Sequence, residues 1–222
     1  MGSSEPNSWP VRLFGGPYKG DEMPKEAAVM DFERSRPEGI LPMPWLSDTS
    51  VGRNFWYYDA GDADAFSTAE LVQILVDIVS KNGCLLLNVG PHPDGTISEK
   101  QRETLLGIGQ WLKENGEAIY GMRPRKVYGE EASPAIRFTS NGDILYAIVL
   151  GVPQGAVTVA SLGRASKWID KPVARVRLMG SEQRLGWTQE SDALVVRVPP
   201  NGLRREHAVV FRIDFGPAIS GR

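Results

Sequence analysis

Two stretches of the chain carry apolar residues at the spacing of amphipathic helices. In the first, apolar positions recur every three or four residues, at Leu71, Ile74, Leu75, Ile78 and Val79. Ser67 and Glu70 precede them with the spacing of a capping box, in which each side chain satisfies a free backbone N–H. The second stretch opens with the similar pair Ser98 and Gln101, and its apolar side consists of Leu105, Ile108 and Leu112. The pattern therefore predicts helices that begin near residues 68 and 99.

Continuous apolar runs predict buried strands. Residues 27–33 form a short run that turns acidic at its end, and residues 84–89 form a run without polar alternation. A run of the second kind is typical of a parallel strand covered on both faces, so we expect Cys84 to be a small buried hydrophobe. Residues 1–26 and 41–64 are rich in turn-forming residues and are expected to be loops. The second of these is long and aromatic, and loops of that length usually carry function.

The pattern changes in the second half of the chain. Short β-branched runs recur at residues 135–138, 144–150, 157–159, 173–178, 194–198 and 207–213, and Asn141-Gly142-Asp143 is typical of a hairpin turn. These features predict an antiparallel β-sandwich that follows an α/β segment with parallel strands. We place the boundary near residue 126, which divides the chain into residues 1–126 and 127–222.

Composition excludes several classes of function. The chain has 25 basic and 27 acidic residues, and this near balance argues against binding to nucleic acid or to an anionic membrane. No window of about 18 apolar residues exists, so no membrane span is expected. The single cysteine excludes an intrachain disulfide. The two histidines, His92 and His207, fall in different predicted domains, so no metal site is expected, and no cofactor motif is present.

The first candidate for catalysis is a pair of carboxylates at the end of the strand predicted at residues 27–33. Asp31 and Glu33 lie at its carboxyl end, which is the end where α/β barrels present their catalytic side chains. A carboxylate at such a position can serve as the general acid of glycoside cleavage. The alternative is structural: Asp31 caps a turn, and Glu33 pairs with Arg34 or Arg36 at the surface.

A second candidate is the aromatic content of residues 41–64. The aromatic side chains are Trp45, Phe55, Trp56, Tyr57 and Tyr58. Such rings can form a wall against the apolar face of a sugar, or they can be core residues that anchor the loop. Asn88, at the end of the apolar run, has a polar amide that must find partners. It is expected to hold loop backbone or to shape a pocket.

Several of these segments together resemble a known family. The run at residues 75–91, continued by residues 94–97 and 111–121, closely resembles the α-L-fucosidases of glycoside hydrolase family 29. Upstream, residues 31–34 and 44–57 look like the same family's preceding segment. Residues 136–138 and 145–151 are similar to the sandwich domain that follows its barrel. The resemblance covers roughly residues 27 to 215.

The resemblance implies a fold and an activity. The fold is the last part of a (β/α)8 TIM barrel, in residues 1–126, followed by the sandwich in residues 127–222. The activity is that of a retaining exo-enzyme that removes terminal α-L-fucose from glycans or glycoconjugates without a cofactor or metal. Glu33 is then the candidate general acid/base, and Phe55 aligns with the aromatic that contacts the methyl side of fucose. Trp56, which stands where the family usually has a glycine, and Trp45 are further candidates for substrate binding.

Two features of the family are not found in this sequence. The motif of its aspartate nucleophile is absent, and no histidine precedes His92, whereas the family's fucose-binding histidines lie in the N-terminal half. We therefore expect a C-terminal fragment that is inactive alone. The alternative is a non-catalytic carbohydrate-binding or structural module. The family suggests a secreted, periplasmic or lysosomal protein, although the chain shows no signal peptide, and the oligomeric state is left open.

Overall fold

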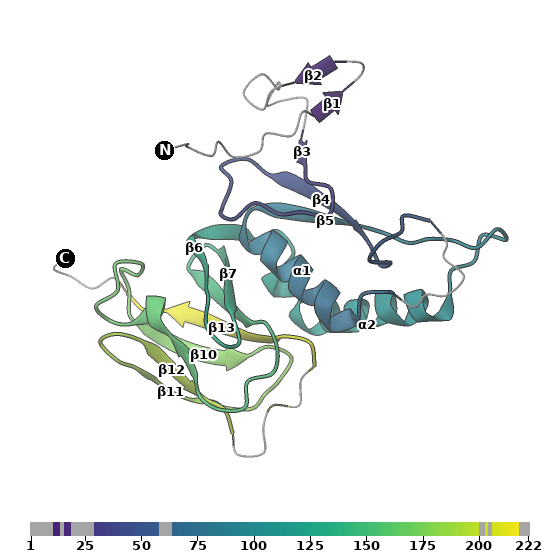
Figure 1. The fold of residues 1–222 in the computed structure, drawn as a ribbon. Coiled ribbons are helices and arrows are strands. Elements are labelled where there is room, and N and C mark those ends of the chain that lie inside the picture. Colours follow the sequence, from purple (N-terminus) through teal and green to yellow (C-terminus); the bar gives the residue numbers. More distant parts are fainter. Residues whose placement is uncertain are drawn as a thin grey trace, which may run out of the picture.

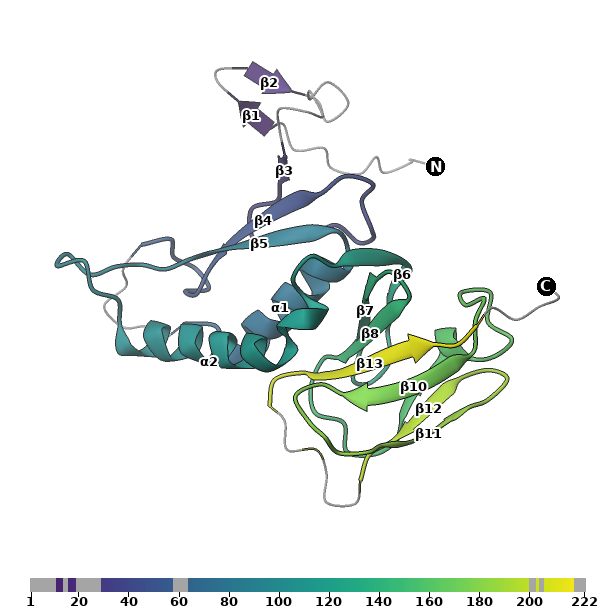
Figure 2. The same ribbon diagram turned by 180° about the vertical axis from the view of Figure 1, so that it is seen from behind.

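The structure is a computed structural model that describes residues 11–13, 16–18, 29–57, 64–199, 203 and 206–217. Figures 1 and 2 show a parallel sheet and two helices, followed by antiparallel strands. The helices lie between the parallel sheet and the antiparallel strands. In particular, α1 (Thr68–Ser80) contacts β5 (Gly83–Asn88) as well as β6 (Arg123–Glu130) and β7 (Ile136–Asn141). The chain thus has the predicted order of an α/β part followed by antiparallel sheets.

The parallel sheet has the strand order β3 (Met30–Asp31), β4 (Trp45–Ser50) and β5. Met30 lies opposite Trp45, and Trp45 lies opposite Gly83. Gly83 has no room for a side chain, because an added Cβ would lie 2.5 Å from the Trp45 ring. The register therefore depends on a glycine at the point where the indole crosses the neighbouring strand.

Both helices begin as the capping sequences predict. Ser67 and Glu70 form both halves of a capping box at the start of α1. At the start of α2 (Glu99–Asn115), the Ser98 hydroxyl accepts a hydrogen bond from the Gln101 backbone N–H, while the Gln101 side chain accepts one from the N–H of Gly90. A 3-10 turn, η1 (Gly116–Ala118), follows α2 and leads into the antiparallel strands.

Two loop predictions are wrong. Residues 1–26 include the short antiparallel pair β1 (Val11–Leu13) and β2 (Gly16–Tyr18). Residues 41–64 include strand β4, whose side chains on the helix-facing side carry hydroxyls, at Ser47 and Thr49. These hydroxyls explain why the sequence pattern did not predict the strand, because strands are recognised mainly by buried apolar positions.

The prediction that residues 84–89 are covered on both faces is also wrong. Leu86 in β5 is 49% exposed, and Cys84 is exposed rather than buried. These two residues alternate with Gly83 and Leu85, so they lie on the face of the sheet away from α1. Within the described part of the chain, helices cover only the other face.

The C-terminal part consists of two antiparallel sheets around a common core. The first has the order β10 (Val173–Leu178), β13 (Val209–Phe215), β8 (Ile144–Val149), β7 and β6. The second has the order β11 (Gly186–Gln189), β12 (Leu194–Arg197) and β9 (Val157–Val159), and η2 (Ala160–Leu162) follows β9. The hairpin predicted at Asn141-Gly142-Asp143 joins β7 to β8.

Two hydrophobic cores lie on the opposite faces of the first sheet. One is the sandwich core between the two sheets, with Phe138, Val159, Leu194 and Phe211 among its members. The other joins the same sheet to α1 and α2 through Tyr146, Ile148 and Val210. Strand β6 of this sheet begins at Arg123, so the boundary predicted near residue 126 falls inside a strand.

Candidate active site

The carboxyl ends of β3, β4 and β5 meet at one edge of the parallel sheet. Beyond β3, the Arg34 N–H donates to the Asp48 carbonyl over 2.9 Å, so pairing with β4 continues past Glu33. Ser50 and Asn88 lie opposite each other at the ends of β4 and β5. This edge is where parallel α/β sheets place ligands and catalytic groups.

Glu33 is held by the indole of Trp56. The Trp56 Nε1–H donates a hydrogen bond of 3.2 Å to Glu33 Oε1, and Glu33 is otherwise exposed. Arg34 places its guanidinium 4.1 Å from the centroid of the Trp56 ring. Arg34 has a φ of 49°, which interrupts the strand alternation and allows neighbouring side chains to reach the same indole. A carboxylate, an indole and a guanidinium are therefore in contact at this edge.

The described part of the structure does not contain the ion pair of Glu33 with Arg34 or Arg36 that was the structural alternative. The Arg34 Nη1 donates to the carbonyl oxygens of Gly52 and Arg53, and Arg36 forms an ion pair with Asp77. Both arginines are thus directed to other partners. The contact that Glu33 makes instead is with Trp56, a residue 23 positions away.

Asn88 holds the loop that carries Trp56. Its Nδ2 donates to the Trp56 carbonyl over 2.9 Å and to Ser50 Oγ over 3.3 Å. The Val51 N–H also donates to the Asn88 carbonyl. This is the structural role expected for the amide at the end of the apolar run, and it connects β5 to the position of the indole.

Asp48 lies on β4 opposite Leu86 and therefore on the open face of the sheet, near Asp31 of β3 and Glu33 just beyond it. Burial raises the pKa of the Asp48 carboxyl above its ordinary value, and the negative charges of Asp31 and Glu33 raise it further. Its Oδ1 is buried and accepts no hydrogen bond from the described residues. The strand that brings Asp48 beside Glu33 was predicted as a loop, so the sequence did not show that these two carboxylates lie side by side.

The aromatic candidates separate in the structure. Phe55 and Tyr57 pack together with ring centroids 5.5 Å apart, and Tyr57 is 68% exposed. Trp45 is 1% exposed, lies at the amino end of β4, and donates its Nε1–H to the Lys81 carbonyl over 2.9 Å. It has no surface to offer a ligand, so its prediction as a substrate-binding residue gives way to the core role. Tyr58 lies outside the described residues.

Other kinds of site find no support in the described part of the chain. The described residues contain no group of three or more histidine, cysteine, aspartate or glutamate side chains that could hold a metal ion. None of the described helices is long and apolar enough to cross a membrane.

Both halves of the chain match models of one protein family. The model "Alpha-L-fucosidase" matches residues 18–117, and the model "Alpha-L-fucosidase C-terminal domain" matches residues 129–214. Human tissue α-L-fucosidase is 29% identical over 82% of this chain and 39% of its own length. Human plasma α-L-fucosidase is 34% identical over 75% of this chain and 36% of its own length.

A solved structure agrees. The crystal structure of Thermotoga maritima α-fucosidase in complex with fucose matches with a TM-score of 0.67 and 32% identity, over 80% of this chain and 41% of that one. The matched models and relatives are α-L-fucosidases, so the class to which this chain belongs is that of the glycoside hydrolases. The chain belongs to the α-L-fucosidase family, glycoside hydrolase family 29, and corresponds to its C-terminal portion. It spans about two fifths of the length of the curated relatives it matches.

Proposed function

We propose that the fucosidase to which this chain belongs removes terminal α-L-fucose from glycans or glycoconjugates with retention of configuration. The observation that carries this proposal is the contact between Glu33 and Trp56 at the carboxyl edge of the parallel sheet. It occurs in a segment that matches the α-L-fucosidase model. The relative whose structure contains fucose supports the choice of sugar.

We also propose that β3, β4 and β5, with α1 and α2, are the last elements of a (β/α)8 barrel within residues 1–126. The sandwich domain then begins with strand β6, a few residues before the predicted boundary near residue 126. The exposed Leu86 and Cys84 support this arrangement, since inward-facing residues of a complete barrel are packed against other strands. Strand β3 is also at the edge of the sheet, where a further strand can pair.

In this proposal Glu33 is the general acid/base. In the first step the Glu33 carboxyl gives its proton to the glycosidic oxygen as the bond from C1 breaks, and a second carboxylate bonds to C1. In the second step Glu33 takes a proton from water, whose oxygen bonds to C1 and releases the second carboxylate. The Trp56 N–H fixes the orientation of the Glu33 carboxylate. The nucleophile motif does not occur in these 222 residues, so the proposal assigns it to another part of the fucosidase.

The neighbouring aromatic residues then contact the sugar. Phe55 faces its methyl side, as the resemblance implies, and the Trp56 face that Arg34 leaves free is a platform for the ring. Trp45 has no part in this, because it is buried at the opposite end of the strand.

The test is hydrolysis of 4-nitrophenyl α-L-fucoside by this chain and by a longer gene product that contains it. We expect turnover by the longer protein only, and NMR of the first-formed fucose should show the α-anomer. Glu33→Ala should lower kcat by about 10²- to 10⁴-fold, and azide should partly restore it. Glu103→Gln, on the exposed face of α2, is the control. A Glu33→Ala protein with near-normal turnover would remove Glu33 from the site.

A second candidate function is supported by a groove on the sandwich. It has a volume of about 630 Å³ and is lined by Trp168, Lys167, Ser166 and Asp192, among others. An aromatic ring beside hydroxyl and charged groups suits a non-catalytic carbohydrate-binding module. Titration of the 222-residue chain with fucose and fucosylated oligosaccharides, followed by NMR, distinguishes hydrolysis from non-catalytic binding. Shifts confined to the groove and abolished in Trp168→Ala would favour binding without cleavage.

A further inference from the structure

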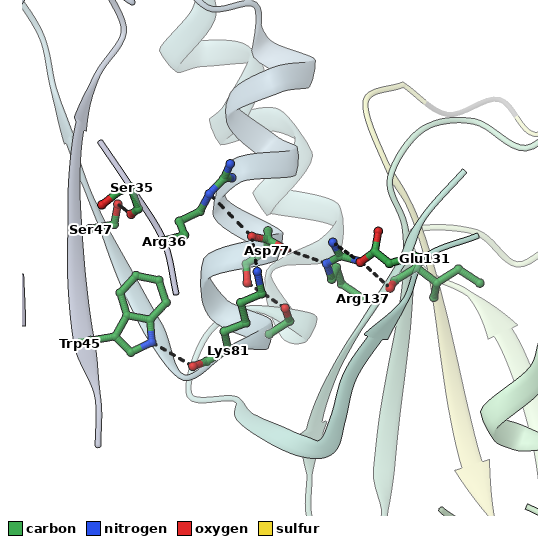
Figure 3. A network of polar contacts seen from close by, with 10 residues as sticks. Ser35, Arg36, Trp45, Ser47, Asp77, Lys81, Glu131 and Arg137 are labelled. Atoms are coloured by element: carbon green, nitrogen blue, oxygen red, sulfur yellow. Dashed lines mark hydrogen bonds and ion pairs between the residues drawn. The ribbon is translucent and has the colours of Figure 1, made fainter. Parts of the chain in front are cut away.

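The carboxylate of Asp77 on α1 is surrounded by three cations. Its Oδ1 accepts a 2.7 Å hydrogen bond from Arg137 Nε, and its Oδ2 accepts one of 3.0 Å from Lys81 Nζ. The Nε of Arg36 lies 3.7 Å from the same Oδ2. Figure 3 shows these side chains converging on Asp77 from three directions. The side chains of Asp77, Lys81 and Arg137 are only 9–10% exposed, so this network is shielded from solvent.

The network joins the two parts of the chain. Asp77 and Lys81 belong to the segment that matches the fucosidase model, whereas Arg137 lies on β7 in the segment that matches the C-terminal domain. Arg137 is fixed from its other side by Glu131, at 2.9 Å. Although burial opposes ionisation, the hydrogen bonds from Arg137 and Lys81 lower the pKa of Asp77. The carboxylate is thus kept charged by a residue of the other domain.

The third cation connects this network to the candidate active site. Arg36 belongs to the segment between β3 and β4, three residues after Glu33. The same segment is held at Ser35, whose carbonyl accepts from Ser47 Oγ over 3.0 Å, and at Leu41, whose N–H donates to the Lys81 carbonyl. Two of its anchors, Asp77 and Lys81, are therefore members of the buried network.

We propose that Arg137, a residue of the C-terminal sheet, is a positioning residue for the segment that carries Glu33 and acts through Asp77. This inference rests on the proposed function of Glu33. Without Arg137, a buried carboxylate loses its closest donor and must draw Lys81 and Arg36 toward itself or toward solvent. Either movement shifts the anchors of residues 33–41. Removal of a contact far from the chemistry can misplace a catalytic group and lower kcat.

The first test measures the segment directly, by amide hydrogen exchange in the 222-residue chain. In Arg137→Met we expect exchange at the Arg34 and Leu41 amides to rise about tenfold or more, because local opening becomes easier. The matched control is Arg212→Met, which removes another ion pair between the two parts, that of Arg212 with Glu117. It should leave the Arg34 and Leu41 amides unchanged.

The variant Arg36→Met distinguishes a loosened segment from a general loss of stability. The Arg36 side chain is 39% exposed, so this change leaves the buried pair intact. It should also raise exchange at Arg34 and Leu41 while β8 amides stay protected. Arg137→Lys, which keeps one donor, should recover part of the protection. If the Arg34 and Leu41 amides exchange at the wild-type rate in both Arg137→Met and Arg36→Met, the inference is overturned.

The second test is catalytic and uses the longer gene product. Arg137→Met should lower kcat about tenfold with a KM within about threefold of wild type, because the acid/base and not sugar binding is displaced. Arg212→Met should match the wild type. An equal loss of kcat in both variants would overturn the positioning role. If the wild-type protein does not hydrolyse fucosides, the proposed function fails, and the exchange test still decides whether Arg137 anchors the segment.

Discussion

Strands β8 and β5 are both rich in apolar residues, but they differ in how many of their faces are covered. β8 is buried on both faces, because Leu145, Ala147 and Val149 point into the sandwich core while Tyr146 and Ile148 point toward α1 and α2. β5 is covered by a helix on one face only, and its Leu86 is 49% exposed on the other. The difference shows that both faces of β8 are packed, whereas the parallel sheet leaves Leu86 and Cys84 exposed on a face that also carries Asp48.

The largest effect that would sharpen this comparison comes from truncating one apolar side chain on each strand. Ile148→Ala should lower the free energy of unfolding by about 3–4 kcal/mol, since it opens a cavity at a residue that is 0% exposed. Leu86→Ala should cost less than about 1 kcal/mol, because its side chain is half in solvent already. Urea unfolding followed by circular dichroism measures both. Equal losses would contradict the assignment of β5 as open.

The next effect concerns how the open sheet is held together. Gly83→Ala adds a Cβ that would meet Trp45 at 2.5 Å and Ile78 at 2.8 Å. Trp45 and Ile78 are buried and cannot move freely, so the expected loss is about 1–3 kcal/mol. Gly109→Ala, on α2, is the matched control, because nothing lies within 4 Å of its added Cβ. Helix propensity predicts that this control raises stability slightly. A Gly83→Ala midpoint at or above the wild-type value would show that the indole can be displaced cheaply.

The sequence predicted the capped helices and the order of the two parts, because caps and apolar periods are local signals. It did not predict β4, whose buried side chains include Ser47 and Thr49, nor the open face of β5. An apolar run states that a strand is hydrophobic and does not state how many of its faces are covered. The contact between Glu33 and Trp56 was also out of reach, since it depends on a 23-residue excursion of the chain.

A smaller effect on stability is expected from the ion pair between Glu70 and Arg53, a residue of the loop that carries Trp56. Arg53 holds the pKa of Glu70 at about 2, helped by the Ser67 N–H and hydroxyl. A lowered pKa in the folded state stabilises the fold above the ordinary value of 4.5, and this contribution is lost as pH falls toward 2. The Glu70 side chain is 43% exposed, so solvent screening limits the contribution to about 0.5–1 kcal/mol.

Glu70→Gln isolates this contribution, because the amide oxygen can still cap α1 while the ion pair with Arg53 is lost. The difference in unfolding free energy between wild type and variant should be greatest at pH 7 and should shrink toward pH 2.5. Urea titrations at the two pH values measure it. A difference that does not change with pH would mean that the charge of Glu70 contributes nothing.

The smallest expected effect has the opposite sign and tests whether the edge of the open sheet is built for stability. Burial, Asp31 and Glu33 raise the pKa of Asp48, so its charged form is unfavourable in the folded protein. That penalty is fully present above the folded-state pKa and disappears below the ordinary value of 3.8. Asp48→Asn should therefore raise the free energy of unfolding at pH 7 by up to about 0.5 kcal/mol.

Asp192→Asn, at an exposed position on the sandwich, is the control and should change stability little. The gain in unfolding free energy from Asp48→Asn should disappear when the unfolding of both proteins is measured near pH 3. At that pH the wild-type carboxyl no longer carries its charge. A loss of stability at pH 7 would mean that the Asp48 carboxylate has a favourable partner in solution. A gain would mean that three carboxylates are kept together at a cost in stability, which is expected where the arrangement serves a substrate rather than the fold.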